Sequence, residues 1–159
     1  MSVAVVKEYL KAYELDDRVQ EFTVSSATVE LAAQALGVAP ELIAKTLSFY
    51  LDDGCVLIVA AGDAKIDNRK FKDQFSCKAK MLVGEDVERL TGHAIGGVCP
   101  FANPEGTPVY LDRSLERFEI VYPAAGSSAS AVKLSCEELM RASNAIAWID
   151  VCKGWNEEA

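Results

Sequence analysis

Residues 46–61, TLSFYLDDGCVLIVAA, decide the fold of this chain. Two apolar runs of strand length, Thr46–Leu51 and Cys55–Ala61, flank Asp52-Asp53-Gly54, and a short turn-forming sequence between two such runs is a strong signal for a β-hairpin. We therefore expect two adjacent antiparallel strands here, joined by a tight turn.

The segments on either side alternate between helical and strand periodicity. Helices are expected over residues 2–14, 41–45, 67–75, 85–90 and 135–142, the last opened by a capping box of Ser135 and Glu138. Another helix is expected through Leu36, with Ser25, Ser26 or Thr28 as its N-cap and Gly37 after its end. Further strands are expected over residues 19–24, 78–83, 108–111, 118–122, 131–134 and 145–151. With no repeat or linker, residues 1–159 are predicted to form a single α/β domain. Its sheet is mixed, mostly antiparallel and curled like a barrel, with about seven strands surrounded by about five helices.

Composition narrows the possible functions. The longest apolar run, Cys55–Ala61, is too short to cross a bilayer, and the N-terminus lacks the pattern of a secretion signal. Five cysteines without a Cys-x-x-Cys pair, beside one histidine, favour a reduced cytoplasmic protein without a disulfide framework or zinc site. No metal or cofactor is expected. A net charge of −8 argues against a broad grip on nucleic-acid backbone, and no basic recognition helix for DNA is present.

A second unusual stretch is Thr91–Phe101, TGHAIGGVCPF, which holds three glycines, a proline and the only histidine. Glycine lets the backbone approach another group closely, and Pro100 fixes the chain direction. The stretch is typical of a rigid loop whose backbone N–H groups could bind an anion or an oxyanion. A tight connection between a helix and a strand explains the same composition.

Two other positions carry candidate chemistry. Lys45 stands among apolar neighbours, so its amine could serve a carboxylate, a phosphate or an oxyanion, or it could complement a helix C-terminus with its head in water. The segment Gly126-Ser127-Ser128 could contact a phosphate or ribose hydroxyl, or form a polar turn. His93 is the only imidazole, so any Ser-His or Cys-His nucleophilic arrangement would have to use it, and Cys99 is the thiol best placed to be reactive; packing explains both residues as well.

The order of these elements is more informative than any one of them. Ala44-Lys45-Thr46-Leu47 leads into the hairpin, Thr91-Gly92-x-x-x-Gly96-Gly97-x-x-Pro100 follows, and Tyr122-x-x-x-Gly126 precedes Ala131-Val132-Lys133-Leu134. In this arrangement the chain resembles the YbaK / prolyl-tRNA-synthetase-associated (INS-like) domain family of aminoacyl-tRNA deacylases, from about Val19 to Val151.

The resemblance implies a YbaK-like fold and trans-editing, the hydrolysis of the ester that joins a wrong amino acid to a tRNA, typically tRNA-Pro. It implies that Lys45 orients the aminoacyl-adenosine end and that the loop of Gly96, Gly97 and Pro100 holds the substrate carbonyl. Binding would position a water or a substrate group for attack, so that no protein triad is required. The residues expected to contact substrate are Phe22, Val24, Thr46, His93, Ile95, Val98, Cys99, Phe101, Gly126, Ser127 and Ser128.

The chain departs from the family pattern near the late glycine. Some members carry a hydroxyl or acidic residue where Ala124, Ala125 and Ala131 stand here, so Ser127 or Ser128 would have to serve. The alanyl-specific branches use a late histidine that this chain lacks. These departures leave open a catalytically inert module that binds an aminoacyl-adenosine or a nucleotide beside a synthetase. A thiol enzyme built on Cys99 and His93 is the third and last-ranked alternative.

The expected partner is the acceptor end of an aminoacyl-tRNA. Because such a contact needs few phosphates, a local basic edge could suffice, formed by Arg69, Lys70, Lys72, Lys78 and Lys80. Alternatively, prolyl-tRNA synthetase or an elongation factor carries the tRNA. A monomer or weak dimer is expected.

Overall fold

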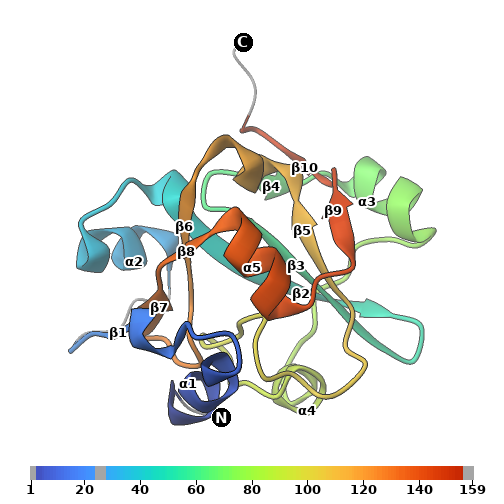
Figure 1. Cartoon of the computed structure of the whole chain (residues 1–159). Coiled ribbons are helices and arrows are strands. Elements are labelled where there is room, and N and C mark those ends of the chain that lie inside the picture. The colour runs from blue at the N-terminus through green and yellow to red at the C-terminus, as the bar shows by residue number, and fades with distance from the viewer. Residues whose placement is uncertain (1–2, 24–27, 156–159) are drawn as a thin grey trace.

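The structure is a computed structural model that describes residues 3–23 and 28–155 (Figure 1). The helices are α1 (Val3–Lys11), α2 (Val29–Leu36), α3 (Asn68–Phe75), α4 (Asp86–Thr91) and α5 (Cys136–Ser143), with 3₁₀ turns η1 (Asp16–Arg18), η2 (Pro40–Leu42) and η3 (Arg113–Arg117). The strands are β1 (Val19–Glu21), β2 (Ile43–Leu51), β3 (Gly54–Ala61), β4 (Lys65–Ile66), β5 (Val109–Asp112), β6 (Ile120–Pro123), β7 (Ser130–Val132), β8 (Leu134–Ser135), β9 (Ala147–Ile149) and β10 (Cys152–Lys153).

The predicted hairpin is the centre of the main sheet. β2 and β3 pair antiparallel from Ala44↔Ala61 to Leu51↔Gly54, so that Asp52 and Asp53 form a two-residue turn. Asp52 has φ 53°, a conformation that Asp tolerates better than most residues. Residues 55–61 are all buried, which explains why they read as a continuous apolar run rather than an alternating one.

The sheet grows outward from this hairpin in the order β8-β6-β2-β3-β5-β9. β6 joins β2 in parallel, β5 joins β3 in parallel, β9 joins β5 in parallel, and β8 joins β6 antiparallel. Two antiparallel pairs, β1 with β7 and β4 with β10, complete the strands. In Figure 1 α5 lies across one face of the sheet, and α2 and α3 lie toward opposite sides of it. The predicted class, a curled mixed sheet in one α/β domain, is confirmed. The six-stranded sheet is not mostly antiparallel, however, because three of its five strand pairings are parallel.

Helix ends follow the capping chemistry of the sequence. Thr28 caps α2 and Gly37 ends it in the left-handed region at φ 72°. Asp67 accepts from the backbone N–H groups of Arg69 and Lys70 at the start of α3. Ser135 forms the predicted capping box at the start of α5. No helix among residues 3–23 and 28–155 has the length and apolar character to span a membrane.

Three predicted elements are wrong in extent. The helix expected over residues 41–45 is only the 3₁₀ turn at Pro40–Leu42, because Ile43 and Ala44 pair with β6 and begin β2. The strand expected over residues 78–83 is reduced to a single bridge between Met81 and Phe49. The strand expected over residues 131–134 is divided, because its two ends pair with different partners, β1 and β6.

Candidate active site

A cavity of about 510 Å³ opens beside β2. It forms because one edge of this strand is only partly covered: β6 pairs with it at Ile43 and Ala44, and the segment at Met81 pairs with it at Phe49. Between these two contacts, residues 45–47 face the cavity. α2, the segment at residues 81–84, the glycine loop (residues 92–101) and β7 form the remaining walls. The volume is in the range of pockets that hold small ligands.

Lys45 lies on this uncovered edge and is half-buried. Its amine donates to the carbonyl oxygens of Gly62, at 3.3 Å, and Ala64. Burial lowers the pKa of the amine, because desolvation disfavours the charged form. A lysine ammonium has three donors, so after these two bonds one donor remains to face the cavity. The two carbonyls therefore fix the direction in which the remaining N–H points.

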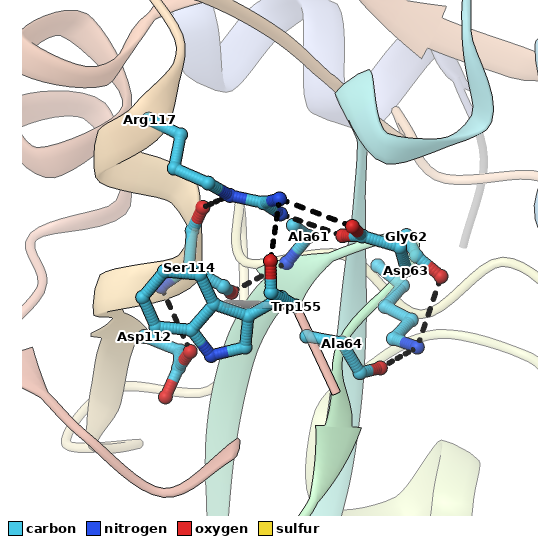
Figure 2. Close-up of polar contacts among 9 residues, drawn as sticks. Ala61, Gly62, Asp63, Ala64, Asp112, Ser114, Arg117 and Trp155 are labelled. Carbon is cyan, nitrogen blue, oxygen red and sulfur yellow. Dashed lines mark hydrogen bonds and ion pairs between the residues drawn. The ribbon is translucent and has the colours of Figure 1, made fainter. Parts of the chain in front are cut away.

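The turn that supplies these carbonyls is held by a network of polar contacts (Figure 2). Arg117 forms a two-pronged ion pair with Asp63, at 2.6 and 3.1 Å, and its Nε donates to the Ser114 carbonyl. The Arg117 guanidinium also lies over the Trp155 ring, 5.1 Å from its centroid. Ser114 Oγ accepts from the N–H of Ala61 at 3.0 Å. The network ties β3, η3 and the C-terminal segment to the turn behind Lys45.

Steric fit fixes the same turn from its other side. A Cβ on Gly62 would lie well inside van der Waals contact of the Pro40 carbonyl oxygen and 2.8 Å from Val29 Cγ1. Because Val29 lines the cavity, the close approach of Gly62 sets both the position of α2 and the carbonyl that holds Lys45. Only glycine fits this position without displacing its neighbours.

The glycine loop starts where α4 ends, with Gly92 in the left-handed region at φ 83°. Asn103 ties the two ends of the loop, because its side-chain amide donates to the carbonyls of Thr91, at 2.8 Å, and Cys99, at 3.0 Å. Within the loop the Gly97 N–H donates to the Ala94 carbonyl at 2.9 Å. The loop is therefore closed at its base and braced inside, which agrees with its interpretation as a rigid turn.

The glycines of this loop pack against the late serine segment. A Cβ on Gly97 would lie 3.0 Å from Ser127 Cα and 3.2 Å from the Gly126 carbonyl oxygen, and one on Gly96 would lie 3.5 Å from Ser128 Cβ. Gly96 has φ 90°, so it needs glycine for conformation as well as for space. The structure thus joins two segments that the sequence singled out separately.

Several residues expected in the site do line the cavity: Lys45, Thr46, Ile95, Gly96 and Val98. Gly97 and Pro100 are buried behind them, and Gly126, Ser127 and Ser128 support the loop instead of lining the wall. Phe22 is partly buried and lies off the cavity wall, its N–H bonded to the Ala129 carbonyl, and Val24 falls outside the described residues.

The expectation that His93, Cys99 and Phe101 contact substrate disagrees with their burial. All three are 0 % exposed and lie outside the cavity lining, so they offer no surface to a ligand. His93 Nε2 lies 2.7 Å from the Phe101 carbonyl oxygen and 3.5 Å from Cys99 Sγ. Burial raises the pKa of the Cys99 thiol to about 12, which keeps it protonated. Because the nucleophile of a thiol enzyme is the thiolate, this geometry opposes the thiol-enzyme interpretation.

Much of the cavity wall was not predicted from the sequence. It is mostly apolar, with Val29 and Ala32 from α2, Met81, Leu82 and Val83 from the segment before α4, and Tyr122, Ala124 and Ala131 near β6 and β7. Ala124 and Ala131 are two of the positions at which the chain departs from the family pattern. At these two positions the cavity wall is therefore apolar, where some family members carry a hydroxyl or an acidic side chain. Ser130 also lines the cavity, but its hydroxyl donates to the Ser127 carbonyl.

The profile of the aminoacyl-tRNA editing domain family matches residues 23–142, and the chain belongs to this family. It is 50% identical to the Bacillus subtilis (strain 168) protein YwhH, whose function is uncharacterised, over 98% of this chain and 99% of that protein. It is also 30% identical to a proline–tRNA ligase of Solidesulfovibrio magneticus over 81% of this chain, which spans only 22% of the ligase.

Solved structures share the fold over nearly the whole chain. One, described as a candidate trans-editing enzyme for prolyl-tRNA synthetase, has a TM-score of 0.86 and 29% sequence identity, covering 96% of this chain and 97% of that one. The family and fold predicted from the sequence are therefore confirmed.

Proposed function

We propose that this protein is a freestanding trans-editing deacylase that hydrolyses the ester of a mischarged tRNA, with tRNA-Pro as the expected tRNA. One observation carries the proposal: Lys45 and Gly96, 51 positions apart in the sequence, line the same cavity. Membership of the editing family and similarity to part of a proline–tRNA ligase support the substrate class.

The site residues suit a reaction that depends on positioning. The oxygen of a water, or of a ribose hydroxyl, attacks the ester carbonyl, and the carbonyl oxygen becomes an oxyanion. Collapse of this intermediate breaks the bond to the ribose oxygen, which takes up a proton. When water is the nucleophile, one water is consumed and the products are a free amino acid and an intact tRNA. When a ribose hydroxyl is the nucleophile, the amino acid moves to that hydroxyl, and a water must then attack the new ester to release it.

We assign the two sides of the cavity different tasks. The remaining donor of Lys45 binds the acylated adenosine end. The backbone N–H of Gly96 or Val98 is the candidate oxyanion donor, because the N–H of Gly97 is already bonded within the loop. Removing one such donor in other enzymes lowers kcat by about 10²- to 10³-fold.

The apolar wall favours a small, uncharged amino-acid side chain as the group that is removed. A methylene in such a pocket is worth only about 1–3 kcal/mol, so discrimination among small side chains is modest. We infer that prolyl-tRNA synthetase or an elongation factor presents the tRNA if the free protein binds it weakly.

A deacylation screen tests the proposal. Purified protein is incubated with tRNA-Pro charged with Ala, Cys, Ser or Thr, and with the same amino acids on their own tRNAs, while Lys45→Ala and Lys45→Arg serve as paired variants. We expect turnover of at least one substrate, with loss of about 10²-fold or more in Lys45→Ala. Wild-type activity in Lys45→Ala would refute the assigned site. Absence of turnover, with binding of an aminoacyl-adenosine analogue retained, would favour the inert module.

A further inference from the structure

The charge of this acidic chain is distributed unevenly. Between Lys65 and Lys80 there are six basic residues and only two acidic ones, Asp67 and Asp73, although the whole chain has net charge −8. Of the basic side chains, those of Lys65, Arg69, Lys72, Lys78 and Lys80 are exposed. The stretch contains β4, α3 and the segment that follows α3.

Both ends of this basic stretch are next in sequence to residues connected with the site. At one end, Lys65 directly follows Ala64, whose carbonyl accepts from the Lys45 amine. At the other end, Lys80 directly precedes Met81 on the cavity wall. α3 lies between these two points, with Phe71 turned into the core and Arg69 and Lys72 exposed. The positive charge is therefore concentrated in one stretch of the chain, which continues directly into the cavity wall at Met81, instead of being scattered over the molecule.

One more lysine joins the stretch through strand pairing. Lys153 in β10 stands directly opposite Lys65 in β4. Like charges in this arrangement repel each other, and an anion beside them would relieve the repulsion. The nearby Asp67 accepts from backbone N–H groups at the start of α3, and the positive charge of Lys153 also helps to lower its pKa; Asp150 is paired with Lys70 at 3.1 Å.

The mouth of the cavity is unusually apolar for an exposed surface. Among the described residues, six large apolar side chains are exposed, and three of them line this cavity: Met81 at 50 %, Val83 at 63 % and Ile95 at 71 %. An exposed apolar patch beside a basic one suits a ligand with flat apolar faces and a charged backbone, which is the chemistry of nucleic acid with unpaired bases.

We propose that the stretch Lys65–Lys80, with Lys153, docks the phosphates of a tRNA acceptor stem, while the unpaired 3′ end passes over Met81, Val83 and Ile95 into the cavity. The proposal rests on the proposed function for the identity of the RNA. It adds a direction of approach: the stem lies over α3 and its 3′ end enters beside Lys45.

The test uses a triple variant, Arg69→Gln/Lys72→Gln/Lys78→Gln, which leaves the cavity wall intact. A matched control, Lys7→Gln/Lys11→Gln/Lys133→Gln, removes the same charge from exposed or partly exposed positions outside the stretch; Figure 1 shows α1, which carries Lys7 and Lys11, far from α3. Circular dichroism and urea unfolding verify that both variants fold. Binding of fluorescein-labelled, uncharged tRNA-Pro is then measured by anisotropy at 50 and 200 mM salt.

The expected effect follows from counterion release. With a slope of about −0.9 per phosphate contact, as for duplex DNA, a fourfold rise in salt weakens binding about 3.5-fold per contact. Three lost contacts would therefore reduce the affinity advantage of the wild type over the triple variant by about 40-fold between the two salt concentrations. A wild-type advantage over the triple variant that stays the same at both salt concentrations would overturn the proposal, and so would a triple variant that binds as tightly as the control variant.

A second measurement separates this proposal from the proposed function. Deacylation of a charged tRNA should fall in the triple variant through KM, while deacylation of an aminoacylated CCA trinucleotide, which lacks the stem, should be unchanged. If the triple variant loses tRNA binding while the wild type shows no deacylation, the docking surface is sustained and the proposed enzyme activity is refuted. Deacylation that is equally efficient in the triple and control variants would sustain the enzyme and refute the docking surface.

Discussion

Gly62→Ala is the substitution for which the structure gives the sharpest expectation. The new methyl group would lie 2.8 Å from Val29 Cγ1, about 1 Å inside the optimal separation of two carbon atoms, and closer still to the Pro40 carbonyl oxygen. Because one obstacle is backbone, a rotamer change in Val29 cannot relieve the overlap. Either α2 and η2 move outward, or the turn at residues 61–64 moves inward.

The magnitude can be worked from these contacts. Overpacking of a core costs about 1–3 kcal/mol, occasionally more. A shift of the turn also weakens the charged hydrogen bond from Lys45 to Gly62, and such bonds contribute about 1.5–3 kcal/mol each. We expect Gly62→Ala to lower the free energy of unfolding by about 2–4 kcal/mol. With a urea m-value of about 2 kcal/mol/M, the unfolding midpoint would fall by about 1–2 M.

Gly54→Ala is the matched control. A Cβ on Gly54, at the start of β3, meets nothing within 4 Å. The same chemical change should therefore alter the free energy of unfolding by less than about 1 kcal/mol in either direction. Urea unfolding followed by circular dichroism measures both variants. Equal midpoints for Gly62→Ala and Gly54→Ala would refute the reasoning, because they would show that the close approach of Gly62 to Pro40 and Val29 is not maintained in solution.

Three further predictions concern the surroundings of Lys45 and the buried thiol. In a double-mutant cycle, Asp63→Asn and Arg117→Gln should couple by about 0.5–1 kcal/mol in urea unfolding, since the pair is partly exposed; additive single effects would contradict its role in holding the turn. Burial lowers the folded-state pKa of Lys45, so the unfolded chain binds the proton more tightly, and stability arising from this group rises with pH up to about 10.5. The free energy of unfolding of the wild type should therefore increase relative to Lys45→Met as pH is raised from 7 to 10, and a constant difference would argue against a desolvated amine. Cys99, whose raised pKa keeps the thiol protonated, should resist iodoacetamide in the native state and react only in denaturant, as followed by peptide mass spectrometry; rapid native labelling at Cys99 would contradict its burial.

Capping and turn residues were the most predictable part of the fold. The capping box at Ser135, the left-handed Gly37 and the turn at Asp52-Asp53 all depend on interactions between residues close in sequence, and all occur as predicted. Predictions failed where strand pairing decided the outcome. Ile43 and Ala44 are strand residues because β6, almost 80 positions later, pairs with them.

The candidate site divides in the same way. The sequence singled out Lys45 and the glycine loop through unusual local composition, and the structure sets Lys45 and Gly96 on one cavity. The sequence could not distinguish the residues that line the cavity from the residues that support it. Ile95 and Cys99 lie four positions apart in one loop, yet the first is 71 % exposed and the second fully buried. The apolar wall from α2 and the segment at Met81 gave no signal, since apolar residues on helices usually face the core.

The sequence by itself determined the β-hairpin, the caps of α2 and α5 and the family, because these rest on local conformational preferences and on motif order. Only the tertiary structure decided that β2 leaves part of one edge uncovered, that the carbonyls of Gly62 and Ala64 hold the Lys45 amine, and that His93 and Cys99 are enclosed. The physical reason is that burial and hydrogen-bond partners are set by segments distant in sequence, which compete for the same space and the same donors.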